Sequence, residues 1–400
     1  MPKSATSSSP RVAIVYDRAN TRYGGAEYLL EVLAQAFPGA DLLTSVSHPQ
    51  ASWQKHFNQV KTSFLQRIPF AKTHHQWFLP LMPLAFESLD VDEYEVIISV
   101  SSAEAKGVIT KPHQLHICYL LTPPRYLYRL DKTYLQTHSW LNWPILKQLS
   151  QLFLTCLRWW DETASLRPDV IVTLSQTVEK RIKNTYHRQV KSIIHPPLKP
   201  LKPNKQLSDS FSKLPSYFLS VSRLVSYKRL DLVIKSILAS NKKLIIVGTG
   251  LELNNLQQLA GSSGWTRPVN MNLKTAIDYI SSQKPAISFL GSVPESSLAS
   301  LYQHCQAVIS PGIEDFGLVP LEAASFGKPS LIHTQSGVGE VLKPDMAVQI
   351  KKQNVAAVTQ GIRQLEQKKF DATKLKSLSK QFSPKTFGLR MIKLVYDELS

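Results

Sequence analysis

The side chains with the greatest capacity for chemistry follow predicted strands in the second half of the chain. Arg223 and Lys228 come directly after the β-branched run 217–221 and precede a helical pattern that begins near Leu230. Two fixed cations at the end of a strand, beside the positive end of a helix, suit the binding of a diphosphate. The alternative interpretation is a solvated cationic turn that binds no ligand.

A second group of such residues lies in the segment 310–324, which follows another predicted strand. Its glycines allow the backbone to approach a ligand closely, and Pro320 marks the start of a helix. Glu314 is expected in the loop and Glu322 in the first turns of the helix, so that both carboxylates can accept hydrogen bonds from hydroxyl groups of one elongated ligand. For Glu322 alone, the alternative is stabilisation of the helix dipole, worth about 0.3–1 kcal/mol. The backbone N–H groups placed to meet phosphates of the ligand are those of Phe316, Gly317 and Leu318.

The first half of the chain contains a weaker signal of the same kind. Gly24 and Gly25 follow the run 12–16 and open a helical pattern that extends to Phe37. A pair of glycines at a helix N-terminus lets backbone N–H groups approach a phosphate or a sugar. The alternative is a simple tight turn.

A regular alternation of strands and helices must position these residues. Short β-branched runs recur, each followed by a helical pattern, which predicts parallel sheets flanked by helices. Four prolines within 196–203 exclude a helix or a central strand there and indicate a linker. The sequence therefore predicts an α/β protein of two Rossmann-like domains facing each other across a cleft, at 1–198 and 199–383, with a C-terminal helix at 384–400 that docks back on the body. The runs expected as strands are 12–16, 41–45, 95–100, 116–120, 170–174 and 190–194 in the first half, and 217–221, 243–247, 287–290, 307–310, 330–333 and 347–350 in the second.

Two stretches depart from this alternation, and a third is expected to be inserted into it. Residues 64–86 carry prolines among bulky apolar residues, and residues 140–160 contain four tryptophans around a Leu-rich core. The tryptophan-rich stretch is either an amphipathic helix in a membrane interface or a helix packed on its domain. Residues 261–285 are polar and rich in Gly and Ser, and we expect them to form a surface insertion.

The composition of the chain excludes several classes of protein. With 43% apolar residues among 400, the chain is neither disordered nor a disulfide scaffold, and its cysteines, at 118, 156 and 305, are expected to be buried thiols.

The net charge of +18 favours anionic partners such as nucleic acid, anionic lipids or phosphorylated small molecules. No signature of an RRM, a KH domain or a zinc module supports nucleic acid, and the lysines between 368 and 380 are expected to form a solvated helix face. The sequence shows neither a metal-ligand cluster nor an apolar run that could span a bilayer, so we expect a cytoplasmic protein, either free or peripheral on the inner face of the cell membrane.

Together these motifs resemble the family-4 glycosyltransferases, which are retaining nucleotide-sugar enzymes of the GT-B fold, over residues 11–399. Arg223 and Lys228 match the family's Arg-x4-Lys, which implies that they hold the donor diphosphate. Glu314 and Glu322 match its Glu-x7-Glu. This match implies that the first carboxylate faces the donor sugar and the second faces the nucleotide ribose.

A more specific resemblance is to bacterial mannosyl- and related transferases of surface-polysaccharide assembly. It implies that the first domain is the acceptor side and that the second binds the nucleotide sugar. Lys106, Arg125 and Asp161 are then candidates on the acceptor side, and Gly24-Gly25 matches the family's first glycine loop. The runs that carry this resemblance are 79–86, Ala105-Lys106-Gly107, 122–126, Trp160-Asp161 and His195-Pro196-Pro197.

The resemblance implies that a hexose, with mannose favoured, moves from a nucleoside-diphosphate sugar to a glycan or lipid-linked acceptor. GDP-mannose or a UDP-sugar is the implied donor, and neither a metal nor another cofactor is implied. The departing phosphate would take the proton of the attacking hydroxyl, while fixed charges stabilise the leaving group. Leu121 stands where the subgroup usually has a His before Thr-Pro. Because that imidazole would contact the reacting sugar or phosphate, the alternative function is a catalytically silent sugar-nucleotide or glycan-binding protein of the same fold.

Overall fold

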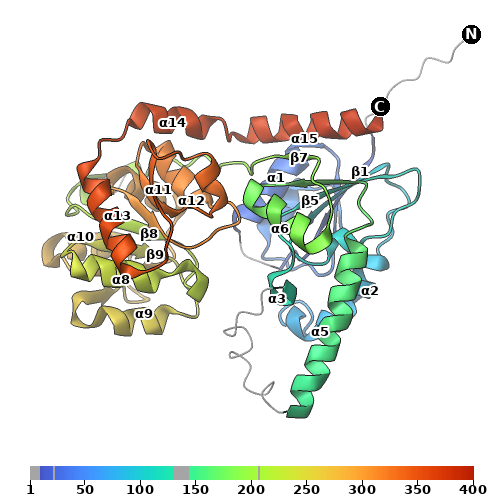
Figure 1. The fold of residues 1–400 in the computed structure, drawn as a ribbon, viewed down its shortest axis with the longest axis horizontal. Coiled ribbons are helices and arrows are strands. Elements are labelled where there is room, and N and C mark those ends of the chain that lie inside the picture. Colours follow the sequence, from blue (N-terminus) through green and yellow to red (C-terminus); the bar gives the residue numbers. More distant parts are fainter. Residues whose placement is uncertain (1–9, 21–22, 129–143, 206–207) are drawn as a thin grey trace, which may run out of the picture. The chain divides into compact units, whose positions relative to one another are not determined.

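The computed structural model describes residues 10–20, 23–128, 144–205 and 208–400 (Figure 1). The chain divides into two compact units. Unit 1 comprises Met1–Pro197 together with Pro384–Ser400, and unit 2 comprises Leu198–Ser383. The proline-rich segment around the boundary contains no helix or strand in the stretch 195–203.

Unit 1 is built around a seven-stranded sheet in the order β3-β2-β1-β4-β5-β6-β7, in which every neighbouring pair is parallel. Its central strands are continuous apolar and β-branched runs because side chains are covered on both faces of such a sheet. Every residue of β1 and of β4 is buried. The strands are β1 Val12–Tyr16, β2 Asp41–Thr44, β3 Val60–Thr62, β4 Val96–Ser101, β5 Leu115–Leu120, β6 Val170–Thr173 and β7 Ser192–Ile193.

The helices of unit 1 include the last helix of the chain. Helix α15 (Pro384–Leu399) packs on α1 (Gly25–Ala36), and the ring of Phe387 lies edge-on to that of Tyr119 in β5, with 5.7 Å between centroids. The helix expected at the C-terminus therefore docks on unit 1 through its buried face (Figure 1). The other helices and 3-10 turns of unit 1 are α2 Met82–Glu87, α3 Arg125–Tyr128, α5 Pro144–Ala164, α6 Gln176–Tyr186, η1 Ser52–His56, η2 Phe64–Arg67, η3 His75–Leu81 and η4 Ala105–Gly107.

Unit 2 repeats the architecture with its own seven-stranded parallel sheet, in the order β10-β11-β9-β8-β12-β13-β14. Separate buried apolar clusters lie on the two faces of this sheet, as expected when helices cover both. The strands are β8 Phe218–Val221, β9 Leu244–Val247, β10 Gly264–Thr266, β11 Ile287–Gly291, β12 Val308–Ser310, β13 Ser330–His333 and β14 Ala347–Ile350. The helices and 3-10 turns are α7 Ser208–Ser212, α8 Leu230–Ala239, α9 Leu253–Ala260, α10 Leu273–Gln283, α11 Glu295–His304, α12 Leu318–Ser325, α13 Val355–Gln367, α14 Ala372–Lys380, η7 Ser226–Lys228, η8 Gly261–Ser263 and η9 Gly337–Glu340.

The expectation of a surface insertion at 261–285 is wrong. This stretch contributes β10, the edge strand that pairs with β11, and α10, which buries Ala276, Ile277 and Ile280. Three apolar residues on one helical turn and a half are enough to dock a helix, and the side chain of Asn272 caps its first turn. The polar composition of the stretch reflects the other, exposed face of α10.

Two smaller expectations also differ from the structure. Cys118 and Cys305 are buried, but Cys156 is exposed on α5 because its apolar sequence neighbours face a different side of the helix. The short strand β3, which was not predicted from the sequence, lies at a sheet edge, where Val60 remains 36% exposed.

The tryptophan-rich stretch forms α5, of which Trp140 and Trp143 lie outside the described residues. Trp160 donates its indole N–H to Glu87 at 2.7 Å and lies against Gly107, whereas Trp159 is 71% exposed. One side of α5 is therefore packed on unit 1, and another presents a large apolar side chain. No helix in the described ranges combines the length and the apolar character needed to cross a membrane.

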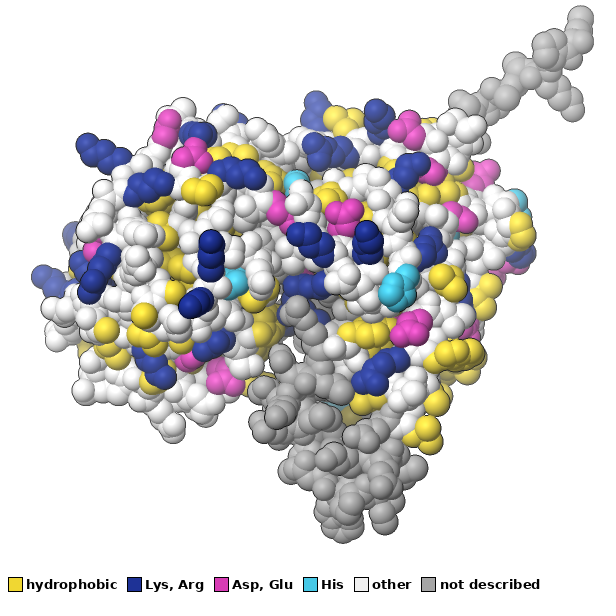
Figure 2. Space-filling model, viewed as in Figure 1, with side chains coloured by type: hydrophobic (Ala, Val, Ile, Leu, Met, Phe, Trp, Pro, Cys, Tyr) yellow, Lys and Arg dark blue, Asp and Glu magenta, His cyan; other side chains and the backbone are white. Residues whose placement is uncertain are grey.

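The basic excess of the chain is spread over its surface. Figure 2 shows Lys and Arg side chains over much of one face, with Asp and Glu among them. In α14 and the turn before it, Lys368, Lys369, Lys374 and Lys376 are exposed, and Lys374 pairs with Asp345. The lysines between 368 and 380 thus form a solvated surface, as the sequence predicted.

Candidate active site

The predicted donor-side residues of unit 2 lie in loops that leave the same edge of its sheet. Strands β11, β9, β8 and β12 are consecutive neighbours and run parallel, so their carboxyl ends meet along one edge. Residues 222–229 follow β8, residues 248–252 follow β9, and residues 311–317 follow β12. This edge of an open parallel sheet is where such folds bind ligands.

The structure brings Lys228 and Glu314 together across two of these loops. The Nζ atom of Lys228 donates to Oε1 of Glu314, and the two side chains are only 15% and 19% exposed. The ring of Tyr227 lies 5.3 Å from the same Nζ. A cation and a carboxylate are thus fixed side by side in a largely desolvated position, where their charges act more strongly than in water.

Arg223 occupies the beginning of the same loop but stays outside this pair. It is exposed, and its Nη2 donates to the hydroxyl of Tyr227 at 3.1 Å. Tyr227 therefore stands between the two cations that the sequence grouped together. The described contacts place Arg223 where an incoming anion can reach its guanidinium.

The backbone of the loop after β12 is held in place by close packing and by hydrogen bonds from a neighbouring turn. A Cβ atom on Gly312 would lie 3.0 Å from the Cα of Lys228, so the two loops touch through their main chains. The hydroxyl of Ser336 donates to the carbonyl of Gly312 at 2.9 Å and accepts from the N–H of Glu314 at 3.1 Å. The N–H of Val338 adds a bond to the carbonyl of Phe316 at 2.6 Å. These contacts fix Glu314 before any ligand arrives.

Helix α12 starts directly after this loop and directs its free N–H groups toward the same edge. Gly317 is its N-cap, and a φ of +99° makes glycine the residue with least strain there. Phe316 is 4% exposed and packs on Phe382, so its role in the structure is to anchor the loop. The N–H groups of Leu318 and its successors are the unpaired donors of the first helical turn, which favour an anion.

Glu322 lies one turn further along α12 and has a partner already. The hydroxyl of Tyr302 in α11 donates to its Oε2 at 2.6 Å. Burial raises the pKa of Glu322, the hydrogen bond from Tyr302 lowers it, and the charge of Glu295 raises it further, with a net rise. A carboxylate held in this way keeps its second oxygen for another donor.

A feature that the sequence reasoning missed is the loop Gly248-Thr249-Gly250 after β9. A Cβ on Gly248 would lie 1.8 Å from the carbonyl oxygen of Ser222, and a Cβ on Gly250 would lie 2.3 Å from that of Leu224. Both positions therefore exclude any side chain, because the loop lies directly against the segment that carries Arg223. A Gly-x-Gly directly after a predicted strand was the signal that could have identified it.

In unit 1, the glycine pair opens α1 as predicted from the sequence. Gly24 is the N-cap residue in an extended conformation, and both Gly24 and Gly25 are exposed. A Cβ on Gly24 would lie 2.9 Å from Oε2 of Glu27, whose Oε1 accepts a hydrogen bond from the hydroxyl of Tyr16. The first turn of α1 therefore carries a buried carboxylate close to its glycines.

The acceptor-side candidates of unit 1 separate into two groups. Lys106 and Asp161 form an ion pair with both side chains 1% exposed, and Asp161 also accepts from the hydroxyls of Tyr128 and Tyr186 at 2.9 and 2.7 Å. Neither side chain is accessible to a ligand. The ion pair instead stabilises the loop that follows β4 and contains Lys106. Arg125, by contrast, lines a cavity of about 140 Å³ together with Thr122, Pro123, Tyr128, Arg181 and Thr185.

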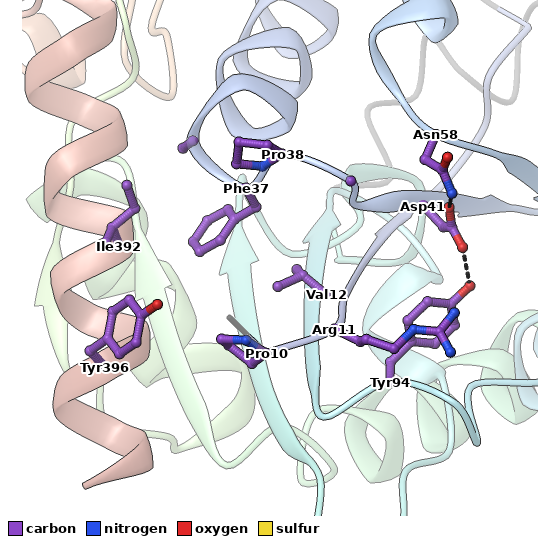
Figure 3. A pocket seen from close by; sticks show the side chains of 12 residues that line it. Pro10, Arg11, Val12, Phe37, Pro38, Asp41, Asn58, Tyr94, Ile392 and Tyr396 are labelled. Carbon is purple, nitrogen blue, oxygen red and sulfur yellow. Dashed lines mark hydrogen bonds between the residues drawn. The ribbon is translucent and has the colours of Figure 1, made fainter. Parts of the chain in front are cut away.

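A larger cavity of unit 1, of about 430 Å³, lies away from these loops (Figure 3). Its lining includes Val12 and Asp41, the first residues of β1 and β2, so it opens at the amino ends of the strands. Asp41 already accepts from Tyr94 at 2.7 Å and from Asn58 at 2.9 Å. The geometry of this cavity therefore does not support a second catalytic centre.

Within the described ranges, no three His, Cys, Asp or Glu side chains lie close enough together to hold a metal ion. Leu121 follows β5 with its N–H bonded to the carbonyl of Ser101 at 2.8 Å, so an apolar side chain takes this place at the carboxyl edge of unit 1.

Comparisons with known proteins show which proteins this chain resembles. Residues 204–382, most of unit 2, match the family model described as Glycosyl transferases group 1. The uncharacterized glycosyltransferase MJ1607 of Methanocaldococcus jannaschii is 25% identical over 150 residues, which cover 36% of this chain and 34% of that protein. The match thus spans about a third of the length of this curated relative.

Solved structures resemble the chain over nearly its whole length. HepE of Anabaena in complex with UDP has a TM-score of 0.64 at 14% identity and covers 97% of this chain and 100% of its own. Sucrose-phosphate synthase of Thermosynechococcus elongatus has a TM-score of 0.63 at 15% identity, with coverages of 97% and 98%. The lipopolysaccharide outer core galactosyltransferase WaaB has a TM-score of 0.62 at 14% identity, with coverages of 97% and 99%. The two parallel seven-stranded sheets and these likenesses show the GT-B fold.

Proposed function

We propose that this protein is a retaining glycosyltransferase of family 4 that moves a hexose from a nucleoside-diphosphate sugar to a glycan or lipid-linked acceptor in cell-surface polysaccharide synthesis. The observation that carries the proposal is the pair formed by Lys228 and Glu314, held beside the main chain of Gly312 and the first turn of α12. It lies in the unit that matches the family model of group 1 glycosyl transferases.

In the proposed donor site, different residues at the carboxyl edge of the sheet in unit 2 bind the diphosphate, the ribose and the sugar. Arg223, Lys228 and the first N–H groups of α12 bind the diphosphate, because all three present positive charge or free donors. Glu322 uses the carboxylate oxygen that Tyr302 leaves free to accept a ribose hydroxyl. Glu314 faces the sugar itself.

The proposed reaction follows from what these charges stabilise. The acceptor hydroxyl attacks the anomeric carbon from the face on which the diphosphate departs, the bond from that carbon to the phosphate oxygen breaks, and the phosphate oxygen takes the hydroxyl proton. Lys228, which exchanges Glu314 for the diphosphate when the donor binds, then stabilises the growing negative charge of the leaving group without reorganising solvent. Glu314 is thereby freed to stabilise positive charge on the sugar.

The sugar and the base of the donor are proposed from likeness. The resemblance of the sequence favours mannose from GDP-mannose. The structures of HepE hold UDP, and one of them holds UDP-glucose, which supports a UDP-sugar as the second donor to be tested. A few contacts decide such a choice between related sugars.

The exposed apolar side chains of unit 1 support a lipid-linked acceptor and a place on the inner face of the cell membrane. Trp159 and Leu152 of α5 are 71% and 64% exposed. Phe70 and Trp77, in the segment before α2, are 67% and 66% exposed. Aromatic side chains with this exposure are typical of surfaces that enter the headgroup region of a bilayer.

Release of the nucleoside diphosphate tests the proposed function. The purified chain is incubated with GDP-mannose, UDP-glucose and UDP-galactose, each with octyl glycosides as acceptors, and the released diphosphate and the glycoside product are quantified. Turnover with one donor supports the proposal. Tight nucleotide binding without turnover for any donor identifies instead the catalytically silent binding protein that Leu121 suggests.

A further inference from the structure

A cluster of polar side chains that the donor site does not use lies at the carboxyl edge of the sheet in unit 1. Asp17 and Arg18 follow β1, Glu104 follows β4, and Tyr126 follows β5. These three strands are consecutive neighbours in the order β1-β4-β5 and run parallel. Their carboxyl ends meet at the edge where an open parallel sheet binds ligands.

The loop that carries Glu104 is fixed by buried charges from both sides. Asp17 is 3% exposed and accepts from the N–H groups of Ser102 at 2.7 Å and of Ala105 at 2.8 Å. Two residues after Glu104, Lys106 forms its buried ion pair with Asp161. The loop therefore cannot relax freely, and the position of Glu104 is imposed on it.

Glu104 has hydrogen-bonding capacity that the protein leaves unused. Its side chain is 2% exposed, and the hydroxyl of Tyr126 donates to Oε1. Its Oε2 is buried without any partner. Because most buried polar atoms in proteins are hydrogen-bonded, an unpartnered carboxylate oxygen in a fixed loop indicates a ligand. Burial raises the pKa of Glu104, Asp17 adds to this rise, and Arg18, Tyr126 and Lys106 oppose it.

Arg18 and Asn20 carry further unused groups. Burial lowers the pKa of Arg18, but the carboxylates of Glu104 and Asp17 outweigh it and hold this pKa above its usual value. Even so, no ion pair or hydrogen bond joins the described side chains of Arg18 and Glu104. Asn20 donates to the carbonyl of Lys72 at 2.9 Å, and its Oδ1 is also buried without a partner. Arg18 and Glu104 thus attract each other without a hydrogen bond between them. Asn20 lies two residues after Arg18 and contacts His75, on whose pKa the charge of Arg18 also acts.

We propose that Arg18, Asn20 and Glu104 form a subsite that binds hydroxyl groups of the acceptor sugar. The inference rests on the proposed transfer reaction and specifies how its acceptor is recognised. A hydroxyl group can both donate and accept a hydrogen bond. Its oxygen accepts from an N–H of Arg18, and its O–H donates to the unpartnered Oε2 of Glu104 or Oδ1 of Asn20. Asp17 and Glu104 oppose the charge of Arg18, which disfavours an anion as the ligand.

The members of the subsite have different roles. Arg18 is largely buried but keeps some exposed surface, so it makes the first contact with the acceptor. Oε2 of Glu104 and Oδ1 of Asn20 have no exposed surface, so the hydroxyl reaches them as the Arg18 side chain turns. Glu104 is therefore both the electrostatic partner that orients Arg18 and the final hydrogen-bond acceptor.

Titration calorimetry tests the subsite without requiring turnover. The full chain is titrated with octyl α-D-mannoside and octyl β-D-glucoside below their micelle concentrations, and separately with inorganic pyrophosphate. We expect one of the glycosides to bind and Arg18→Gln to weaken it about 10- to 100-fold, the loss for one hydrogen bond to a charged group. Failure of both glycosides to bind the wild type, or binding of pyrophosphate that Arg18→Gln abolishes, overturns the proposal.

Two amide substitutions separate a functional role of Glu104 from a structural one. Glu104→Gln should weaken glycoside binding and raise Tm at pH 7.5, because it removes a buried carboxylate charge that no ion pair among the described residues compensates and whose Oε2 has no hydrogen-bond partner. A raised pKa makes ionised Glu104 destabilising above its usual range, so the gain in Tm should shrink toward pH 4. Asp41→Asn is the matched control: both oxygens of this buried acid are paired, so Tm should fall while glycoside binding stays unchanged. A lower Tm for Glu104→Gln with unchanged glycoside binding makes Glu104 structural and overturns its assignment.

The proposed reaction and the subsite can fail independently. In kinetics with an active donor, Arg18→Gln and Glu104→Gln should raise the KM for the octyl glycoside and leave the KM for the donor and its slow hydrolysis unchanged. Glycoside binding that depends on Arg18 in a chain without turnover refutes the transferase and retains the subsite. Turnover with an acceptor KM that neither variant changes refutes the subsite alone.

Discussion

The ammonium group of Lys228 donates a hydrogen bond to the carboxylate of Glu314, although the two residues lie 86 positions apart in the sequence. The contact arises because β8 and β12 are neighbours in the sheet of unit 2, so the loops that follow them leave the same edge. A cation that already has a carboxylate partner must exchange it for the diphosphate when a donor binds. This exchange makes the kinetic effects of the two residues distinguishable.

Removal of either cation should reduce turnover strongly. Lys228→Ala and Arg223→Ala should each lower kcat/KM by about 2.7–4 kcal/mol of transition-state stabilisation, since both act on charge that grows as the diphosphate leaves. Steady-state kinetics with the best donor of the panel measures the loss, and circular dichroism confirms the fold. Lys235→Ala, an exposed lysine on α8, is the control and should behave as wild type. Unchanged turnover in either site variant removes the diphosphate assignment.

The two carboxylates should affect different kinetic parameters. Glu322→Ala should mainly raise the donor KM and weaken binding of the free nucleoside diphosphate, because a ribose hydroxyl is the same in the ground and transition states. Glu314→Ala should mainly lower kcat, because the sugar gains positive charge only in the transition state. Calorimetry with the free nucleotide, combined with kinetics, measures both. Loss of nucleotide binding in Glu314→Ala with no effect of Glu322→Ala would reverse the two roles.

The glycine loop after β9 should tolerate no side chain at its first position. A Cβ on Gly248 would meet the carbonyl of Ser222 at 1.8 Å, and a φ of +137° adds strain for any other residue. Gly248→Ala should therefore displace the segment that carries Arg223, weaken nucleotide binding at least tenfold and lower Tm. Thr249→Ala in the same loop is the control, because this position already carries a Cβ atom and the substitution requires no change of the backbone. Wild-type nucleotide affinity in Gly248→Ala would show that the loop does not position Arg223.

The exposed apolar side chains of α5, Leu152 and Trp159, should mediate binding to anionic membranes. Co-sedimentation with vesicles that contain phosphatidylglycerol should exceed that with pure phosphatidylcholine, and added salt should release the protein. Trp159→Ala should reduce this binding several-fold, whereas Leu251→Ala, at an 81% exposed position in unit 2, should not. Equal binding to both vesicle types, or none, means that α5 is only a packed helix.

Acid should destabilise unit 1 through His116. This side chain is fully buried against Ser99, and burial lowers its pKa from 6.5 to about 3, with a smaller effect of Arg167. The unfolded chain therefore binds a proton between pH 6.5 and pH 3 that the folded chain does not, so stability is complete above pH 6.5 and falls as the pH drops through this window. The slope from this group is at most about 1.4 kcal/mol per pH unit. Denaturant unfolding at several pH values should show a smaller slope for His116→Gln than for wild type, and equal slopes would contradict the assignment.

The sequence alone determined the features that depend on neighbours within one element. Alternating strands and helices, the proline-rich stretch after His195 and the terminal helix are encoded in local periodicity and in the backbone limits of proline. The order of Arg223, Lys228, Glu314 and Glu322 after their strands followed from the same local patterns. These signals span a few residues, so they are readable without any knowledge of distant contacts.

Only the tertiary structure decided which polar side chains are buried, paired or left without a partner. Lys106 and Asp161, 55 positions apart, were interpreted as ligand-facing candidates, but the fold buries them against each other. The unpartnered oxygen of Glu104 and the contact of Gly248 with Ser222 were equally invisible, because each depends on loops that parallel strands bring together from distant parts of the chain. Exposure of Cys156 likewise depends on which face of α5 packs on the unit. Burial and pairing are properties of three-dimensional neighbours, and a linear pattern records only those within a turn or a strand.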